Sequence, residues 1–410
     1  MTSSQDGQPR ALEGIRVLDL TRVLSGPYCA LLLGELGAEV IKVEKPGRGD
    51  HSRRPRGGPG NTGLRFLAWN MYRKSITLDI WQPEGRELFM RLVAQSDVVL
   101  ENFRPNVMAK AGLDYETLRS ANSGIVLASI TGFGQNTSFS QRTAHASVIS
   151  AFTGIQHMNR FGNSPPMPTP GASPDIAAGT HAAIGILAAL VGRAGTGRGR
   201  HVDVSMVDAM VGQYAFDLMH VLLTGELNPE RELRAGDGHS TTKAGPAFHE
   251  CYEASDGWFY LQADLPAQWE RLAREILPPE LRDDPRFETE AARSENKADL
   301  DEILRGWLMN RTKEEAFEIL GGAGVPCSPA YSLKEVAHHP YLRERGILQE
   351  IDDPRLGRMM VLSPRIRFVD EPPIAARYAP LLGEQNREVF QSLLGLSEDE
   401  IQALQEKDVI

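Results

Sequence analysis

The sequence predicts an α/β protein in which a doubly wound domain, built on a parallel sheet, is followed by a smaller domain. Strand patterns alternate with helical patterns over the first part of the chain, which is typical of a parallel sheet. The pattern changes near Gly225, where a polar, glycine-rich stretch precedes two short strands with alternating apolar residues. The 410 residues, 41% of them hydrophobic, suffice for two or three domains.

A βαβ unit opens the chain. Residues 15–20 (IRVLDL) predict a strand, and they lead through the loop TRVLSGP into the helical segment PYCALLLGELG. A second strand, AEVIKVE, follows. Because a strand, a helix and a strand in this order pair in parallel, the first loop lies at the carboxyl end of a strand.

Two further buried strands are predicted, over residues 96–103 (SDVVLENF) and 124–134 (GIVLASITGFG). The helical segment PEGRELFMRLVAQ precedes the first of them. Asp175 then opens a long apolar helix over residues 176–193, which the glycine-rich segment GRAGTGRGR ends. The segment HVDVSMVDAMVGQYAFDLMHVLL adds a strand and a helix.

The smaller domain begins after Gly225. The segment FHECYEASDGWFYLQA predicts two alternating strands joined by a Ser-Asp-Gly turn. Three helices continue the domain: QWERLAREI, ADLDEILRGWLMN and KEEAFEILGGAG. Short strands (ILQEI, MMVLSP, RIRFV) and two helices (NREVFQSLLGL, EDEIQALQE) complete the chain.

Composition excludes several classes of function. A net charge of -10 argues against nucleic-acid binding, which depends on clustered Lys and Arg. The three cysteines, Cys29, Cys251 and Cys327, have neither zinc-ligand nor disulfide-framework spacing, so a reducing cytoplasm is expected. The polar start MTSSQDGQPR lacks the apolar core of a signal peptide. The longest apolar stretch, residues 182–191, is too short to span a bilayer, so no membrane association is expected.

The first loop lacks the Gly-x-Gly-x-x-Gly pattern that binds dinucleotides, which disfavours a hydride-transfer enzyme. Its actual sequence, VLDLTRVLSGPYCALLLGELGAEVIKVEKPGRGD, is followed in order by the blocks NMYRKSITLDI, VVLENFRP and GIVLASITGFGQ. From about Ala11 to the C-terminus the chain resembles the family III CoA-transferases, also called the CaiB/BaiF type. The formyl-CoA, carnitine-CoA and glutarate-CoA transferases belong to this family.

The resemblance implies a Rossmann-like large domain over residues 11–224, which binds coenzyme A, and a small α+β domain over residues 225–330. It also implies that residues 331–410 return to the large domain. In this family two subunits thread through each other as interlocked rings, so an interlocked homodimer is expected.

The resemblance places the family's nucleophilic aspartate at Asp175, in SPDIAAGTHAAIGILAALVGR. An aspartate carboxylate can accept the acyl group of an acyl-CoA as a mixed anhydride and then carry CoA as an aspartyl thioester. An acceptor carboxylate reverses these steps, so no permanently bound cofactor and no metal is expected. By position alone, an aspartate before a helix is more often a structural cap.

The resemblance also implies a coenzyme A site. Positions that contact coenzyme A in the family match residues of this chain in the first loop, after the second strand, and in and after the blocks LDI and ENF. The residues are Val23, Leu24, Ser25, Lys45, Leu78, Asn102, Phe103 and Lys110. Taken singly, Leu78 and Phe103 are more typical of a core and Lys110 of a solvated surface. Trp81 stands where the family has a contacting lysine, so part of the phosphate site differs.

His145 leaves a second activity open. The segment TAHASVISAFTG resembles the region of the α-methylacyl-CoA racemases that carries a catalytic histidine. His145 and Asp175 could together exchange an α-proton of an acyl-CoA, which would make the protein a racemase or isomerase. However, Ala146 stands where racemases have aspartate, and no matching acid is evident in QADLPAQW. A structural or substrate-contacting histidine is the third interpretation.

Two further hypotheses concern loops. Arg160, in QHMNRFGNSPPMPTP, could pair with the second carboxylate of a dicarboxylic acceptor, or it could be a surface arginine. Residues 236–245 (GDGHSTTKAG) could gate the site as a mobile glycine loop, or they could simply link the domains. A noncatalytic acyl-CoA-binding protein is the alternative outside enzymes, and it requires Asp175 to be dispensable.

Overall fold

The computed structural model describes residues 10–54, 63–159, 164–227 and 248–410. Arg160 and the loop 236–245 lie outside these ranges. The chain divides into two compact units, which are described separately. Unit 1 comprises Met1–Ile155, Pro168–Gln213 and Pro340–Ile410, and unit 2 comprises Gln156–Met167 and Tyr214–His339.

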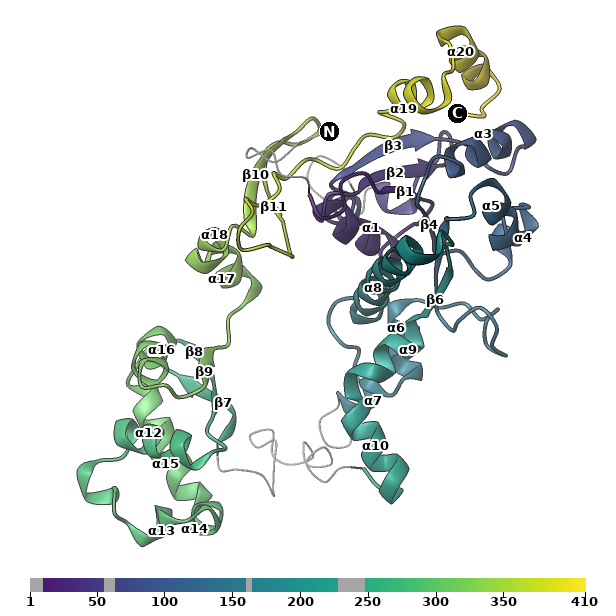
Figure 1. Ribbon diagram of the computed structural model, residues 1–410. Coiled ribbons are helices and arrows are strands. Elements are labelled where there is room, and N and C mark those ends of the chain that lie inside the picture. The colour runs from purple at the N-terminus through teal and green to yellow at the C-terminus, as the bar shows by residue number, and fades with distance from the viewer. Residues whose placement is uncertain (1–9, 55–62, 160–163, 228–247) are drawn as a thin grey trace. The chain divides into compact units, whose positions relative to one another are not determined.

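Unit 1 is built on a six-stranded, fully parallel sheet with the order β3-β2-β1-β4-β5-β6 (Figure 1). This confirms the predicted α/β fold with a parallel sheet. The strand order reverses between β1 and β4, which creates the switch point where doubly wound proteins bind ligands. The strands are β1 (Arg16–Asp19), β2 (Glu39–Glu44), β3 (Arg73–Thr77), β4 (Val98–Glu101), β5 (Val126–Thr131) and β6 (His201–Ser205).

The four strands predicted first are confirmed with slightly shorter ends, because each is an apolar run buried on both faces. β3 was not predicted as a strand. Its sequence, RKSIT, looks too polar for a buried parallel sheet, yet Arg73 and Ser75 of this edge strand are buried and hydrogen-bonded to other side chains. Tertiary partners therefore make this polar strand possible.

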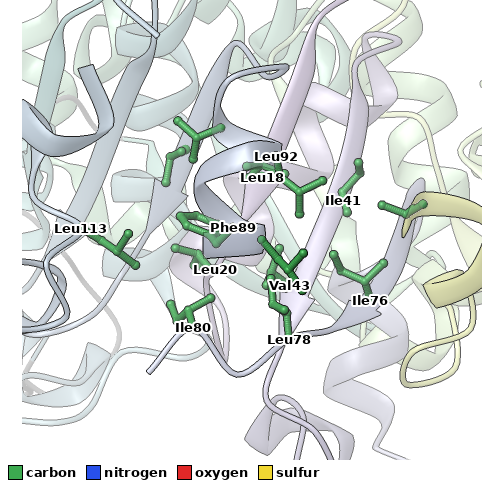
Figure 2. Packing of buried hydrophobic residues seen from close by; sticks show 14 of the residues in the cluster. Leu18, Leu20, Ile41, Val43, Ile76, Leu78, Ile80, Phe89, Leu92 and Leu113 are labelled. Carbon is green, nitrogen blue, oxygen red and sulfur yellow. The ribbon is translucent and has the colours of Figure 1, made fainter. Parts of the chain in front are cut away.

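A hydrophobic core covers one face of the sheet (Figure 2). Leu18, Ile41 and Ile76 from three strands meet Phe89 and Leu92 of helix α3 (Pro83–Val93). Helix α19 (Asn386–Leu394) packs against α3 and β3, and α20 (Glu398–Glu406) follows it (Figure 1). The C-terminal segment thus completes this core. Other helices of unit 1 are α1 (Ser25–Glu35), α2 (Leu64–Trp69), α4 (Val107–Lys110), α5 (Tyr115–Ala121), α6 (Ala146–Phe152), α9 (Met206–Val211) and α18 (Pro340–Glu344).

Helix α8 (Ser173–Thr196) is the long apolar helix that the sequence predicts. Its N-cap is Ala172, so the prediction that Asp175 caps the helix is wrong. Pro174 occupies the first turn, where its missing N–H has no partner to lose, and the helix therefore starts before Asp175. Asp175 is the third helical residue, and its carboxylate is available for other contacts.

By length and composition, α8 is the one helix in the described ranges that could cross a membrane. Its alanines Ala178 and Ala182 and its Ile186 are fully buried. The helix packs against α1, β5 and β6. These contacts make it a core helix of unit 1.

Unit 2 contains a three-stranded antiparallel sheet in the order β7-β8-β9. β7 (His249–Ala254) and β8 (Gly257–Gln262) confirm the predicted hairpin, and β9 is Cys327–Pro329. The three predicted helices are also confirmed, as α12 (Pro266–Ile276), α15 (Lys297–Met309) and α16 (Lys313–Gly322). The remaining helices of this unit are α10 (Ala215–Thr224), α13 (Pro285–Glu288), α14 (Glu290–Glu295) and α17 (Leu333–His338), and α7 (Ile155–Met158) begins at the boundary between the units.

The predicted strands ILQEI and MMVLSP form an antiparallel pair, β10 (Leu348–Asp353) with β11 (Gly357–Leu362). The third predicted strand, RIRFV, is wrong, because residues 365–369 have no strand structure. The Arg365 N–H donates instead to the Glu35 carboxylate at 3.1 Å, and the Arg365 guanidinium pairs with the same group. The Glu35 side chain thus accepts a backbone N–H that a neighbouring strand would bond in a sheet.

Candidate active site

The predicted site residues lie in unit 1, and most of them follow the carboxyl ends of neighbouring strands. Val23, Leu24 and Ser25 follow β1, Lys45 follows β2 directly, and Leu78 follows β3. Asn102 and Phe103 follow β4, which is the neighbour of β1. Since the carboxyl ends of parallel strands share one edge, these residues lie along the edge that contains the switch point.

Asn102 holds the first loop through both atoms of its side-chain amide. Its Oδ1 accepts the Arg22 N–H at 2.9 Å, and its Nδ2 donates to the Arg22 carbonyl at 2.8 Å. The same Nδ2 lies 3.3 Å from the Ser25 Oγ. Asn102 therefore joins the end of β4 to the start of α1.

Asp175 contacts the start of α1. The Ser25 N–H and hydroxyl lie beside the Asp175 carboxylate and stabilise its charged form. One turn further along α8, Gly179 lies against the Ser25 carbonyl, and a Cβ there would come within 2.5 Å of that oxygen. The two helices therefore approach closely only because position 179 has no side chain. The Asp175 carboxylate lies in the first turn of one helix and near the first residue of another, where exposed amides and helix dipoles favour negative charge.

Burial raises the pKa of Asp175 to about 6, against the opposing effects of the Ser25 N–H, the positive charge of His145 and the Ser25 hydroxyl. The carboxylate is therefore ionised above about pH 6, and it is half-buried. Such a group is a better nucleophile than a solvated carboxylate, because less hydration must be removed before it attacks.

His145 immediately precedes α6 and is exposed. It is near enough to Asp175 for its charge to affect that carboxylate. The structure thus brings together the two residues on which the racemase hypothesis depends.

The residues predicted to bind coenzyme A differ in accessibility. The Lys45 ammonium is half-exposed and pairs with Asp79 at 3.2 Å. Phe103 lies under the Arg22 guanidinium, 5.0 Å from ring centroid to Cζ, and its ring is 6.2 Å from that of Trp81. Trp81 is 42% exposed, so an aromatic surface stands where the family has a lysine.

Two predicted contacts have less to offer a ligand. The side chain of Leu78 belongs to the hydrophobic core, so only its backbone could reach a ligand (Figure 2). Lys110 ends α4 and is exposed. Across the described ranges, no cluster of three His, Cys, Asp or Glu side chains could hold a metal ion.

Glu101, the last residue of β4, is buried beside the site. Its Oε2 accepts the Phe103 N–H at 2.7 Å. Burial raises the pKa of Glu101 to about 7, although a hydrogen bond from Ser129 and the Phe103 N–H oppose this shift. Glu101 and Gly179 were not predicted as site residues from the sequence, and neither were the buried charged residues Asp19, Lys42, Asp50 and Arg73. A lone glycine four residues after Asp175 in an apolar helix was the available signal.

A parallel α/β sheet with a half-buried carboxylate of raised pKa near its switch point is typical of an enzyme's ligand site. The family model for CoA-transferase family III matches residues 12–386. The chain therefore belongs to the family III CoA-transferases.

Several curated relatives are CoA-transferases. The chain is 36% identical to a succinyl-CoA–D-citramalate CoA-transferase of Chloroflexus aurantiacus, over 99% of this chain and 100% of the relative. It is 31% identical to the human succinyl-CoA:glutarate CoA-transferase, over 94% and 86% of the two chains. A formyl-CoA:oxalate CoA-transferase of Bradyrhizobium is 33% identical, over 96% and 95%.

Solved structures agree with these relatives. A CaiB/BaiF family protein from Brucella suis superposes with a TM-score of 0.80 at 33% identity, covering 94% of this chain and 100% of the other. Family and fold thus support CoA transfer as the activity.

Proposed function

We propose that this protein moves CoA from an acyl-CoA to a free carboxylic acid through covalent intermediates on Asp175. The observation that carries the proposal is the Asp175 carboxylate itself, which is half-buried, ionised above about pH 6 and stabilised by Ser25 near the switch point. A half-buried carboxylate next to two helix N-termini suits nucleophilic catalysis, because partial exclusion of water also slows the hydrolysis of reactive intermediates.

The first half of the reaction loads the enzyme. An Asp175 oxygen attacks the thioester carbonyl, the carbon–sulfur bond breaks, and CoA leaves as a thiolate from a mixed anhydride. The thiolate then attacks the Asp175 carbonyl carbon, and the donor acid leaves as a carboxylate. Asp175 now carries CoA as a thioester.

The second half reverses these steps with another acid. The acceptor carboxylate attacks the Asp175 thioester and releases the CoA thiolate, which leaves a new mixed anhydride. The thiolate attacks the acceptor's carbonyl carbon, so the new acyl-CoA forms and Asp175 regains its carboxylate. In both anhydrides the Ser25 N–H is positioned to donate to the Asp175 oxygen on which charge develops.

The coenzyme A site would use the other predicted residues. Lys45 would exchange its pairing with Asp79 for a phosphate, and Phe103 with Arg22 would border the nucleotide. Asn102 would keep the first loop, with Val23 and Leu24, in place for the thioester arm. The backbone of Leu78 and the ammonium of Lys110 would complete the phosphate region.

The acceptor is proposed to be a dicarboxylic acid. The relatives named above act on D-citramalate, glutarate and oxalate, and each of these carries two carboxyl groups. No permanent cofactor enters the scheme. A reducing cytoplasm is the proposed compartment, because all three cysteines are free thiols.

A homodimer, interlocked as in the family, is also proposed. Helix α10 supports it, since Phe216, Leu222 and Leu223 are 72%, 75% and 80% exposed. An apolar helix this open is typical of a surface that another chain covers. Light scattering would show about twice the 45.1 kDa mass of one chain, and a monomer at micromolar concentration would refute the dimer.

The test is intact-protein mass spectrometry after incubation with a panel of acyl-CoAs, in ordinary and deuterated water. Wild type should gain a CoA-sized covalent adduct, and Asp175→Ala should gain none. Asp208→Ala is the matched control, because Asp208 is an exposed aspartate in the first turn of another unit 1 helix, α9.

The proximity of His145 to Asp175 supports an alternative, the exchange of an acyl-CoA α-proton. Deuterium uptake at the α-carbon without any adduct would establish this racemase activity and overturn the transferase proposal. An adduct without deuterium uptake would support the transferase proposal and refute the racemase activity. Stabilisation by CoA with neither result would indicate a noncatalytic binding protein.

A further inference from the structure

Four charged side chains are completely buried beneath the first loop. Asp19, Lys42, Asp50 and Arg73 each have a side chain that is 0% exposed or nearly so, and the two acids offset the two bases. Burying four charges is unfavourable unless each is paired and hydrogen-bonded. Such a cluster is therefore expected to have a structural or functional task.

Asp19, Lys42 and Arg73 hold both ends of the first loop. The Lys42 Nζ donates to the Thr21 carbonyl at 2.7 Å, and the Asp19 Oδ1 accepts the Thr21 N–H at 2.9 Å. The Arg73 guanidinium bonds Asp19 at 2.6 Å and the Pro27 carbonyl at 2.8 Å.

Asp50 holds the middle of the loop. Both of its carboxylate oxygens lie 3.2 Å from the Val23 nitrogen, and the Ser52 N–H donates to one of them at 2.8 Å. The Lys42 Nζ lies 3.3 Å from Asp50. Although burial raises the pKa of Asp50, the charge of Lys42 and these N–H groups lower it below its ordinary value, so Asp50 is ionised.

Val23 has a φ of 70°, in the left-handed region. A β-branched residue disfavours this region strongly, because its Cβ approaches the backbone. The conformation persists only where surrounding contacts enforce it. The bonds of Asp50 to the Val23 N–H are the direct contact that does so.

The strained residue determines where the next amides point. Ser25 is two residues after Val23, its carbonyl lies against Gly179 one turn after Asp175, and its N–H and hydroxyl stabilise the Asp175 carboxylate. If Val23 relaxed to a negative φ, the chain direction into α1 would change and the Ser25 N–H would turn away from Asp175.

We infer that Asp50, itself oriented by Lys42, is a positioning residue that keeps Val23 left-handed and so aims the Ser25 N–H at the Asp175 carboxylate. The inference deepens the proposed function and rests on it for the catalytic meaning of that N–H. It assigns Asp50 no contact with substrate.

The charge of Asp50 and its positioning role have opposite effects on Asp175. Losing the Ser25 N–H would raise the pKa of Asp175, because that N–H stabilises the carboxylate. Losing only the negative charge of Asp50 would leave Lys42 less compensated and would lower the pKa of Asp175. The sign of the change in a variant therefore separates the two roles. In wild type the positive charge of His145 lowers the pKa of Asp175, and His145 is unchanged in every variant below.

The experiment measures the ionisation of Asp175 without any substrate. Protein labelled with carboxyl-¹³C aspartate is titrated by NMR, and the Asp175 resonance is assigned by its loss in Asp175→Asn. In parallel, the rate of CoA-adduct formation is followed for each variant.

Asp50→Ala is expected to raise the pKa of Asp175 and to slow adduct formation at least tenfold. Adding Val23→Gly should return both toward wild type, because glycine adopts the left-handed region without strain. Asp50→Asn keeps one oxygen for the Val23 N–H and the same shape but loses the charge, so it should not raise the pKa of Asp175 and should leave adduct formation close to wild type. Asp50→Ser, whose hydroxyl is too short to reach the Val23 N–H, carries the test if Asp50→Ala does not fold.

Glu35→Gln is the matched control. Glu35 is a buried, ion-paired carboxylate at the other end of the same helix, α1, where it pairs with Arg365. The Glu35→Gln variant should lower the free energy of unfolding but leave the pKa of Asp175 unchanged. An unchanged or lowered pKa of Asp175 in Asp50→Ala or Asp50→Ser, or no recovery with Val23→Gly, overturns the inference. Absence of an adduct in wild type is a separate result that counts against the proposed function.

Discussion

Gly179 of α8 lies directly against the Ser25 carbonyl of α1, and a Cβ at position 179 would be 2.5 Å from that oxygen. The N–H of the same Ser25 stabilises the carboxylate of Asp175, one turn earlier on α8. The close approach of the two helices and the placement of the proposed nucleophile are therefore one feature.

Gly179→Ala should move α8 and weaken the site. The new Cβ would also meet the Cys29 nitrogen at 3.3 Å, and backbone atoms cannot move aside cheaply. Overpacking of this kind costs about 1–3 kcal/mol, which outweighs the gain of up to about 1 kcal/mol from alanine's helix propensity. The melting temperature should fall, and adduct formation should slow by about two orders of magnitude, because a displacement near 1 Å suffices for that.

Gly192→Ala is the control for this prediction. Position 192 lies in the same helix, and its added Cβ would meet only the Arg200 side chain, at 4.0 Å. This variant should be as active as wild type and slightly more stable. Equal activity of the two glycine variants would show that the close approach has no functional role.

Adduct formation should depend on pH through Asp175. The attacking form is the carboxylate, and burial raises the pKa of Asp175 to about 6. The rate should therefore be constant above that pH and fall about tenfold per unit below it. Single-turnover rates at saturating acyl-CoA between pH 4.5 and 8 measure this. A limb near pH 4, the ordinary range of aspartate, would mean that Asp175 is solvated in the working enzyme.

His145→Gln should shift the same limb to higher pH. Removing the histidine's positive charge removes an effect that lowers the pKa of Asp175. If His145 only tunes Asp175, the variant still forms the adduct at pH 8, at a rate close to wild type. Complete loss of turnover at pH 8 would instead make His145 a reacting group, as the racemase hypothesis requires.

Glu101→Gln should stabilise the protein at high pH. The folded-state pKa of about 7 lies above the ordinary value of 4.5, so folding favours the protonated acid. The free energy of unfolding of wild type is therefore highest, with respect to Glu101, below about pH 4.5. It falls by an amount of the order of 3 kcal/mol as the pH rises through 7. Glutamine does not titrate and can still accept the Phe103 N–H.

Urea unfolding at pH 5 and pH 8 checks this prediction. The variant's advantage in free energy of unfolding should be larger at pH 8 than at pH 5. Glu116→Gln, an exposed glutamate of α5, should show no such difference. The reverse pH trend in Glu101→Gln would contradict the argument.

Lys45→Ala should weaken coenzyme A binding. A charge-assisted hydrogen bond to phosphate contributes about 1.5–3 kcal/mol, so the KM for the acyl-CoA should rise about 10- to 100-fold with a smaller change in kcat. Lys407→Ala removes a lysine that pairs with Glu84 at 2.8 Å on the surface, and it should leave KM unchanged. Similar KM values for the two variants would remove Lys45 from the proposed site.

The sequence alone predicted the parallel α/β fold, most of its strands and the long helix of Asp175, because apolar periodicity within one element reports its burial. It also placed Val23, Lys45 and Asn102 after strands, where the topology brings them to one edge. The sequence did not predict the polar strand β3, and it predicted a strand at residues 365–369 that does not form. In both places an arginine, Arg73 or Arg365, bonds a carboxylate distant in the chain.

Only the tertiary structure decided how Asp175 is held. Its contact with Ser25 depends on how closely two helices pack, and the bond from Val23 to Asp50 joins residues 27 positions apart. Periodicity is local and carries no information about such distances. The residue types of the site could therefore be predicted from the sequence, whereas the geometry that orients the carboxylate and raises its pKa follows from packing between elements.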